Sequence, residues 1–546
     1  MKKLLAALFL SATLALTAQE KEKSADYYKE LSDNIKLYFD ILLTLNENYV
    51  DTANIEELMA EGIKAMLSTT DPYTVLLKET ELDHYSELSS GSYGGIGIYI
   101  GTSGPEKRLT VISPMDDTPA SKVGLRAGDQ IIFIDDRDTK GMSVKDASDF
   151  LRGDAGTKLK LKIKRIGVEQ LLIFNLTRAK INIQNVPYSE VIDNEVGYIK
   201  LTQFTATSYS DFTKEFEKLV SQGAKSLIID LRYNPGGLLE SSVKHCSSFL
   251  PRGKLVVSTK GRGGSSLDNR YITEIPPSDT EIPLAILING SSASASEIFA
   301  GSLQDHDRAV IVGESSFGKG LVQQLFDVGM MKKRSLKVTV RKYYTASGRL
   351  IQKEDYFGDR TLNGTDTVFF KTLVNGRKVP SGVGIIPDVN VEDKKNSDFI
   401  ASLKMNNLFS NFMYDFYISH PDYKYNGTVD ESLITEFKNY IGDKKFEYKS
   451  SAETITDSLL NFTEKNKYSD EIIKQIKLTL ESFKSSKSDD FKNNIDEIRS
   501  NLSIEFGVYQ KGNREKYRII NKTDPQIRKA VEILKDRSGY RKLLGY

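Results

Sequence analysis

With 546 residues, the chain is long enough for about three or four domains of ~150 residues each. Its hydrophobic content of 39% and charged content of 27% are ordinary for globular protein. The formal net charge of +1 gives no reason to expect a nucleic-acid partner, and the single cysteine, Cys246, excludes intrachain disulfides.

The N-terminus has the pattern of a secretory signal. Lys2 and Lys3 precede an apolar run from Leu4 to Leu16, and small residues stand near Ala18. This pattern predicts a signal peptide over residues 1–18. A membrane anchor is the alternative, but the run is shorter than the ~20 residues that a span needs. We therefore expect an exported, periplasmic protein without a transmembrane segment.

Residues 24–87 are predicted to be helical. Apolar residues recur at helix spacing from Tyr38 to Tyr49, and Ile55 to Leu67 repeats the pattern. The sequence Asp71-Pro72-Tyr73-Thr74 then interrupts it, as an Asp-Pro turn should. We interpret this segment as a helical arm that packs against the rest of the chain or dimerises.

Residues 91–178 form a separate module. In Tyr93-Gly94-Gly95-Ile96-Gly97-Ile98, glycines beside a β-branched strand leave backbone N–H groups open for a carboxylate. The later stretch S-K-V-G-L-R-A-G-D-Q-I-I-F-I-D and the helix Val144 to Leu151 resemble a PDZ domain. The resemblance implies that Gly95, Ile96 and Gly97 bind a peptide's C-terminal carboxylate and that Leu151 lines the pocket for its last side chain. The alternative is that the glycines only make a tight bend.

A catalytic domain is predicted over residues 181–393. Val196 to Leu201 and Ser226 to Leu231 have strand patterns, and Ser208 to Gln222 between them has the pattern of an amphipathic helix. This alternation indicates an α/β core. At the end of the second strand, L-R-Y-N-P-G-G makes a glycine turn, and such a sequence alone is usually just a turn.

The rest of the domain is organised around residues 283–324. A buried strand, Leu284 to Ile288, leads into the serine cluster Ser291 to Ser296, and a helix follows. Ser294 at the first helical turn lies where unpaired N–H groups and the helix dipole favour an oxyanion. Serine needs a base to act as a nucleophile, and Lys319 could serve if it is desolvated enough to lose its proton.

Three other interpretations compete for the same residues. Ser294 and Glu297 form an S-x-x-E capping box, which can be a mere helix start. Residues 313–319 match the G-x-x-x-x-G-K of a phosphate loop, but Gly320 stands where Ser or Thr should bind magnesium. The neighbours Asp305 and His306 suggest a serine, histidine and aspartate triad, although adjacency in sequence does not create triad geometry.

A resemblance favours the serine and lysine interpretation. N-x-x-S-A-S-A-S-E-I, then L-Q-D, then G-E-x-x-F-G-K-G-x-V-Q resemble the active-site region of the carboxyl-terminal processing peptidases, which are serine endopeptidases. The resemblance implies that Ser294 is the nucleophile, that Lys319 is the general base and that Gln323 orients this lysine. Asp305 matches an aspartate of the motif and is a supporting candidate without an assigned role.

The same resemblance extends to other segments. The L-R-x-N-P-G-G turn implies an oxyanion hole formed by Gly236 or Gly237 together with the N–H of Ala295. The D-P-x-[ST] turn matches the helical N-terminal segment of these peptidases. For the core, the resemblance implies an α/β fold of the ClpP/crotonase-like type.

Residues 394–546 contain no recognisable catalytic or ligand-binding sequence motif. The helix-like segments in this region are Ser397 to Tyr417, Leu433 to Tyr440, Ala452 to Lys465 and Ser469 to Phe483. We expect an α-helical extension that could brace the catalytic domain, dimerise or bind an adaptor, and the sequence does not choose among these.

Together these features predict a multidomain α/β protein that acts as an exported serine endopeptidase. Its PDZ domain would capture the C-terminus of a protein or peptide substrate for cleavage, with no metal or cofactor required. A PDZ-based scaffold or chaperone without activity is one alternative, and the intact Ser294, Lys319 and Gln323 argue against it. An acyl-CoA enzyme is another, which the PDZ module and the secretory signal argue against.

Overall fold

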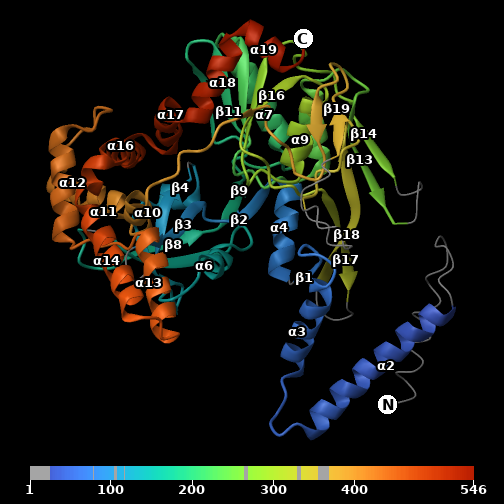
Figure 1. The fold of residues 1–546 in the computed structure, drawn as a ribbon, viewed down its shortest axis with the longest axis horizontal. Helices are drawn as coiled ribbons and strands as arrows, with labels where there is room; N and C mark the ends of the chain where they lie inside the picture. The colour runs from blue at the N-terminus through green and yellow to red at the C-terminus, as the bar shows by residue number, and fades with distance from the viewer. Residues whose placement is uncertain are drawn as a thin grey trace.

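The computed structural model describes residues 25–77, 79–103, 107–115, 117–165, 167–262, 268–328, 334–353 and 368–546. The predicted signal peptide lies outside these residues. Figure 1 shows a helical arm near the N-terminus, a small β domain, an α/β domain and a helical C-terminal domain, which confirms the predicted fold class. No helix in the described ranges combines the length and the apolar character that crossing a bilayer requires.

The arm consists of α2 (Ala25–Asn48) and α3 (Ile55–Ser68), and none of the residues of α2 is buried. The Asn54 side chain accepts the Glu57 N–H at the start of α3, as an N-cap residue does. The arm leads into β1 (Val75–Leu77) and α4 (Glu79–Ser90). Because β1 pairs antiparallel with β18 of the α/β domain, the arm is joined to that domain by a sheet and not only by a linker.

The small domain is a sheet of antiparallel strands in the order β3-β4-β5-β7-β8, with β6 beside β5. Their bounds are β3 (Ile98–Ser103), β4 (Arg108–Pro114), β5 (Gln130–Ile134), β6 (Arg137–Asp138), β7 (Lys158–Lys164) and β8 (Leu172–Thr177). In β7, lysines alternate with buried Leu159, Leu161 and Ile163, which gives the sheet one apolar face. The helices α5 (Pro119–Lys122) and α6 (Val144–Leu151) complete the domain, and β2 (Ser92–Gly95) pairs with β9 (Ala179–Asn182) at its base.

The α/β domain is built on a sheet in the order β10-β11-β12-β15-β16-β21. The strands are β10 (Tyr188–Ile192), β11 (Val196–Lys200), β12 (Ser226–Asp230), β15 (Leu284–Ile288), β16 (Ala309–Gly313) and β21 (Val389–Asn390). They are parallel except for β10. Every residue of β11, β12, β15 and β16 is buried, as expected for parallel strands with both faces covered.

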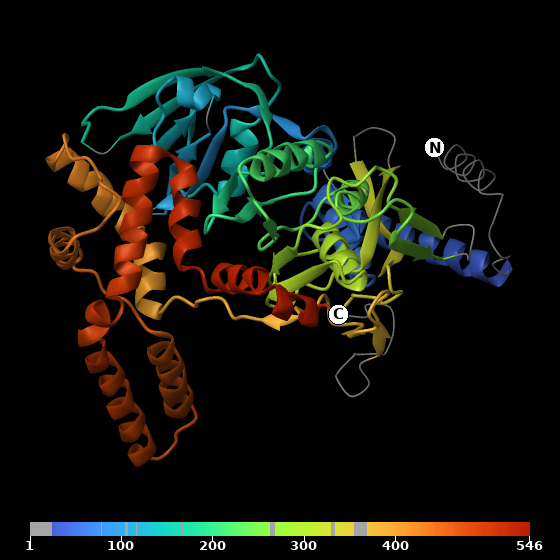
Figure 2. The same ribbon diagram turned by 90° about the horizontal axis from the view of Figure 1, so that it is seen from above.

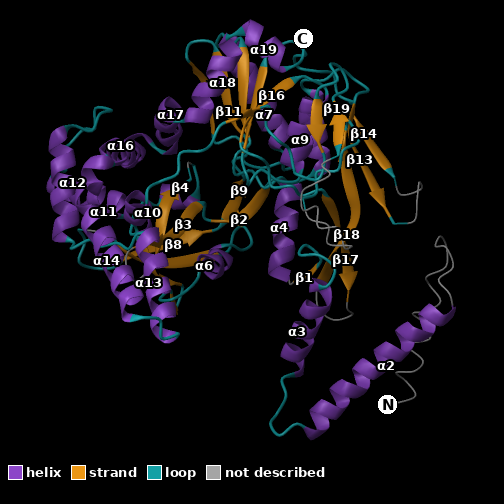
Figure 3. Cartoon of the chain, in the orientation of Figure 1, coloured by secondary structure: helices purple, strands orange, loops and turns teal. Residues whose placement is uncertain are grey.

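Helices cover this sheet on both faces, as Figure 3 shows. On one face lie α7 (Ser208–Ser221), α8 (Leu239–Ser247) and α9 (Ala295–Asp305), whose apolar side chains form one core with the sheet. On the other face lie α18 (Pro525–Lys535) and α19 (Arg537–Leu543). The last residues of the chain therefore form the third layer of the α/β domain, although about 130 residues separate them from β21.

A second, antiparallel sheet flanks the first one. It has the order β1-β18-β13-β14 with β17 also beside β18. Its strands are β13 (Leu255–Gly261), β14 (Asn269–Ile272), β17 (Leu321–Val328) and β18 (Arg334–Thr345), and a separate hairpin pairs β19 (Phe369–Lys371) with β20 (Lys378–Pro380). Since β17 begins two residues after Lys319, this sheet determines where the candidate base lies.

The C-terminal domain has an aromatic-rich core of its own. Its helices are α10 (Asp398–Met405), α11 (Leu408–Ser419), α12 (Glu431–Asp443), α13 (Ser451–Lys465), α14 (Asp470–Ser486), α15 (Asp490–Asn493), α16 (Ile495–Lys511) and α17 (Asn513–Thr523). The pattern of Ser397 to Tyr417 predicts one helix, but Asn407 has a φ of 53° and divides it into α10 and α11. Helices α13 and α14 form a hairpin that projects from the body (Figure 2).

Candidate active site

The local backbone at Ser294 is unusual. Ser294 precedes the first residue of α9 and has φ 56° and ψ −114°, outside the regions that residues with a side chain normally occupy. Such a conformation costs about 1–3 kcal/mol and persists only where the surrounding structure enforces it. The turn that leads into Ser294 is held by Ser292, whose hydroxyl accepts the Asn289 N–H and donates to the Leu231 carbonyl. The sequence prediction of Ser294 at a helix start is confirmed, with a strained turn added.

A buried carboxylate joins Ser294 to Lys319. Glu297 Oε2 accepts the N–H of Ser294 at 2.8 Å and the N–H of Lys319 at 2.9 Å. Its Oε1 accepts the Gly318 N–H at 2.7 Å and the Ser316 hydroxyl at 2.5 Å. Burial raises the pKa of the Glu297 carboxyl to about 7, and these hydrogen bonds act against the rise. One side chain therefore sets the separation between the candidate nucleophile and the candidate base.

Tyr343 of β18 makes a second link. Its buried hydroxyl lies within hydrogen-bond distance of the Ser294 carbonyl, at 3.2 Å, and of the Lys319 carbonyl. In the sequence, Glu297 is notable only as part of a capping box, and no pattern points to Tyr343 as a site residue. Both contacts depend on segments that meet only in the folded chain.

Lys319 lies in an environment that favours its neutral form. Burial lowers the pKa of Lys319 to about 8, and the nearby charge of Lys337 acts in the same direction, while Glu297 and Asp71 act against it. The ammonium lies 4.5 Å from the centre of the Tyr73 ring. A lysine with a pKa near neutrality can act as a general base, which an ordinary surface lysine cannot.

The Asp-Pro turn of the arm forms part of this environment. Asp71 accepts the N–H groups of Tyr73 and Thr74, so the turn is fixed by its own aspartate. Asp71 also accepts the Thr339 hydroxyl at 3.1 Å, and Thr74 accepts the Thr339 N–H at 3.1 Å. The turn thus docks on β18 and places Tyr73 against Lys319, a contribution that the sequence interpretation of the arm missed.

Gln323 lies on the same network. Its side-chain amide donates to Thr339 Oγ1 at 3.3 Å, next to a register shift between Val322 and Gln323 in the β17 and β18 pair. The hydrogen bond of this glutamine therefore runs through Thr339 to Asp71, and not directly to the lysine that the resemblance assigns to it.

The glycine turn after β12 lies directly over Ser294. A Cβ added to Gly236 would stand 2.9 Å from the Ala295 nitrogen and 3.0 Å from Ser294 Cβ, so only glycine allows this approach. The Gly236 N–H already donates to Asn234 Oδ1 at 2.9 Å. Within the described ranges, the N–H groups of Gly237 and Ala295 have no protein acceptor. This geometry favours Gly237 with Ala295, and not Gly236, as the pair of donors for an oxyanion.

Asp305 lies far from the reacting groups. It ends the 11-residue helix α9, roughly 16 Å from Ser294 at 1.5 Å per residue. Its carboxylate forms a fully buried ion pair with Arg349 at 2.9 Å and accepts the Ser347 N–H at 2.8 Å. Asp305 therefore holds the turn after β18, the strand that carries Tyr343 and Thr339.

The competing interpretations of the sequence do not fit the geometry. The N–H groups of Gly318 and Lys319 are taken by Glu297, so the glycine-lysine segment is not open to cradle a phosphate. His306 Nε2 lies 2.8 Å from the Leu255 carbonyl at the far end of α9. Cys246 is fully buried, and burial raises the pKa of its thiol.

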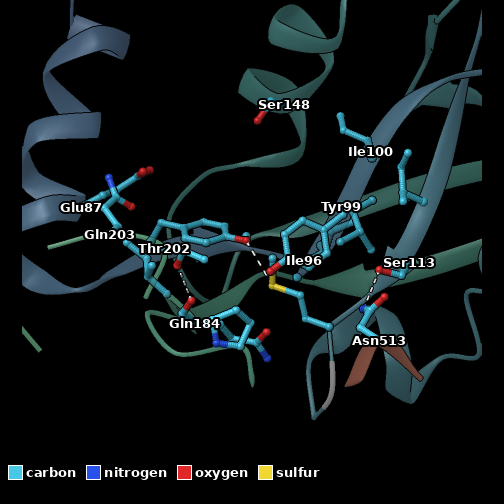
Figure 4. A pocket seen from close by; sticks show the side chains of 18 of the residues that line it. Glu87, Ile96, Tyr99, Ile100, Ser113, Ser148, Gln184, Thr202, Gln203 and Asn513 are labelled. Atoms are coloured by element: carbon cyan, nitrogen blue, oxygen red, sulfur yellow. Dashed lines mark hydrogen bonds between the residues drawn. The ribbon is translucent and has the colours of Figure 1, made fainter. Parts of the chain in front are cut away.

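A second candidate site lies on the small domain. A cavity of about 1110 Å³ is lined by Gly95, Ile96, Gly97 and Leu151, the four residues predicted to bind a peptide. Figure 4 shows Ile96, Tyr99 and Ile100 on one side of it and Ser148 of α6 on the other. Gly97 has a φ of 74°, and a Cβ there would clash with Thr118, so this glycine serves the turn as well.

Comparisons with known proteins agree with this organisation. Residues 195–359 match peptidase family S41, residues 110–165 match the PDZ domain, and residues 399–534 match the C-terminal helical domain of a probable PDZ-protease. A carboxy-terminal-processing protease of Bartonella bacilliformis is 36% identical over 353 residues, which cover 64% of this chain and 79% of that protein. The carboxy-terminal processing protease CtpA of Bacillus subtilis is 32% identical over 355 residues, 64% of this chain and 72% of that protein.

A solved structure with a related sequence is the photosystem II D1 C-terminal processing protease. It is 27% identical and covers 65% of this chain and 92% of its own, with a TM-score of 0.36.

Proposed function

The chain belongs to the carboxy-terminal processing proteases of peptidase family S41, and from that premise we propose that it cleaves exported proteins with Ser294 as nucleophile and Lys319 as general base. It is a serine-type peptidase with a PDZ domain, an S41 core and a helical C-terminal domain. The observation that carries the proposal is the Glu297 carboxylate, which accepts the N–H of both proposed catalytic residues through one oxygen.

The proposed reaction begins with proton transfer. Neutral Lys319 takes the proton of the Ser294 hydroxyl, and the alkoxide forms a bond to the scissile carbonyl carbon. The N–H groups of Gly237 and Ala295 stabilise the resulting oxyanion; the loss of one such donor costs ~3 kcal/mol in typical enzymes. The peptide C–N bond then breaks, and the Lys319 ammonium returns its proton to the departing amine.

Hydrolysis of the acyl-enzyme completes the cycle. Lys319, neutral again, takes a proton from water, and the hydroxide attacks the ester carbonyl. The ester C–O bond breaks, and Lys319 returns the proton to Ser294. Gln323 and Asp305 would act as positioning residues, and the Gln323 contact with Thr339 and the Asp305 pair with Arg349 support this role.

The substrate is proposed to enter by its C-terminus. Gly95, Ile96 and Gly97 would bind the terminal carboxylate through backbone N–H groups, and Leu151 would contact the last side chain. Export to the periplasm is supported by the signal pattern over residues 1–18.

Cleavage of an unfolded reporter with an apolar C-terminus tests the proposal. The purified protein is compared with Ser294→Ala and Lys319→Ala, and activity is expected to fall below about 10⁻³ of the parent in both variants. Retained activity in Lys319→Ala would exclude this lysine as the base. A parent protein that binds the reporter without cutting it would instead favour the scaffold alternative.

A further inference from the structure

The cavity on the PDZ domain is not lined by that domain alone. Its wall includes Gln184 and Val186 of the α/β domain and Asn513, Arg514, Lys516 and Tyr517 of α17. Figure 4 shows Asn513 beside the PDZ strands, with its hydrogen bond to Ser113. A helix of the C-terminal domain therefore takes part in a groove that the sequence assigns to the PDZ domain only.

Helix α17 is held in this position from two domains. The Asn513 amide donates to Ser113 Oγ at 2.9 Å on the PDZ domain. On the α/β domain, Arg514 donates to the Ser189 carbonyl at 3.0 Å, Tyr517 stacks on Tyr188 with ring centres 5.4 Å apart, and Arg518 pairs with Glu190 at 2.8 Å. These contacts make the first turns of α17 a fixed wall of the groove.

The register of β3 decides which peptide side chains would face this wall. β3 is an edge strand with β4 as its sheet neighbour, so a peptide can add to its other edge. Ile98 and Ile100 pack against the same core as Leu151, whereas Tyr99 between them points to the opposite face and is 42% exposed. Tyr99 is paired with Ser113, the residue that binds Asn513. The Tyr99 face is therefore the α17 face.

The side chains of a peptide bound as an extra strand alternate between the two faces of the sheet, as those of β3 do. If its last side chain lies against Leu151, the third from last lies on the same face, and the penultimate and fourth from last point toward the Tyr99 face. In this groove these two side chains meet α17 and not open solvent.

The charges on the wall indicate which side chains fit there. Of the charged residues that line the cavity, Arg152 is paired with Glu87 at 2.6 Å, and Arg514 is bound to the Ser189 carbonyl. Lys516 is exposed, and it forms no salt bridge with an acid in the described part of the chain. Its charge acts on Lys404 and on Glu505, a half-buried acid whose pKa burial raises to about 7. Lys516 is thus a cation available to a ligand.

We infer that α17 is part of the peptide-recognition site and that Lys516 favours substrate tails with Asp or Glu at the penultimate or fourth-from-last position. The inference rests on the proposed binding of C-terminal tails by the PDZ domain. It adds a substrate class: proteins that end in an apolar residue preceded by acidic side chains at alternate positions.

Binding of labelled peptides to the full-length Ser294→Ala protein tests this inference without cleavage. Three fluorescein-labelled decapeptides share one apolar C-terminal residue and carry Glu, Gln or Lys at both alternate positions. We expect the Glu peptide to bind about threefold to tenfold more tightly than the Lys peptide at low salt, with most of the difference lost in 0.5 M salt. The variant Lys516→Glu should reverse the order of the peptides.

The matched control is Lys522→Glu, an exposed lysine of the same helix that does not line the cavity. It makes the same change of charge and should leave the order unchanged. Equal binding of all three peptides, or an order that Lys516→Glu leaves intact, would overturn the inference while the proposed PDZ function stands. Failure of every peptide to bind would overturn both.

Discussion

At the scale of single residues, the candidate site depends on an acid, Glu297, that takes no part in the proposed reaction. Glu297 is 1% exposed, and it accepts four hydrogen bonds from the segments that carry Ser294 and Lys319. An ionised carboxylate can accept all four because it has no donor of its own. Any group that presents an N–H or O–H in this place disturbs at least one of the four contacts.

The variant Glu297→Gln tests this role. Its amide NH₂ would face two N–H donors, so the Ser294 and Lys319 segments should separate slightly. Because small misplacements of catalytic groups are costly, we expect kcat to fall about 10²-fold with KM within about threefold. Steady-state kinetics on the reporter give both values. Glu240→Gln, an exposed acid in the first turn of α8, is the matched control and should behave like the parent.

The pKa of Lys319 sets a second expectation. In the proposed mechanism the active form is the neutral lysine, so kcat/KM should rise tenfold per pH unit below about 8 and level off above it. Below about 7, protonation of Glu297 removes acceptors as well, and the slope should steepen. Lys337→Met removes a positive charge that lowers the pKa of Lys319. The rising limb of the kcat/KM profile should therefore move to higher pH, and activity at pH 7 should fall roughly twofold or more.

A pH profile of kcat/KM from 6 to 10 measures this shift. Lys337→Arg keeps the charge and is the control. A limb that stays in place in Lys337→Met, with normal activity at pH 7, would show that Lys337 does not act on the base.

At the scale of elements, the sequence predicts most of what local patterns determine. The order of β15, the serine turn and α9 follows from an apolar run and helix periodicity, and the structure has these elements at the predicted residues. The four predicted peptide-binding residues also line one cavity. The predicted elements are confirmed because each depends on residues close together in the chain, and the peptide-binding role of the four cavity residues stays a prediction.

The rest depends on contacts between distant segments. Tyr73 reaches Lys319 only because β1 pairs with β18, and periodicity in the arm carries no sign of that pairing. In the same way, Lys516 lines the cavity on the PDZ domain although it lies more than 350 residues beyond Leu151. The division between α10 and α11 was missed for a local reason, because Asn407 adopts a left-handed conformation that asparagine tolerates but does not signal.

At the scale of the whole molecule, the C-terminal region is not a simple appendage. Arg232, next to the glycine turn, pairs with Asp524 at 2.7 Å. It also donates a hydrogen bond to the side-chain oxygen of Gln526 at 2.9 Å. Tyr540 accepts the Leu284 N–H at 3.0 Å at the start of β15. The two last helices thus hold both segments that meet at Ser294. The α13 and α14 hairpin, in contrast, leaves Ile455, Leu459 and Phe462 largely exposed.

A leucine-to-alanine substitution, made once in α18 and once in the α13 and α14 hairpin, tests whether the two regions contribute differently to stability. Leu534 of α18 is 1% exposed against the main sheet, and Leu534→Ala should destabilise the α/β domain by about 2–5 kcal/mol through the cavity that it leaves. Leu459 of the hairpin is 49% exposed, and Leu459→Ala should change stability by less than about 0.5 kcal/mol. The measurement is the urea concentration at which peptidase activity is half lost, since the chain has no tryptophan to report unfolding. That midpoint should fall for Leu534→Ala alone. Equal midpoints would mean that the catalytic sheet is stable without its third layer, and that the C-terminal helices serve the peptide groove and not the peptidase core.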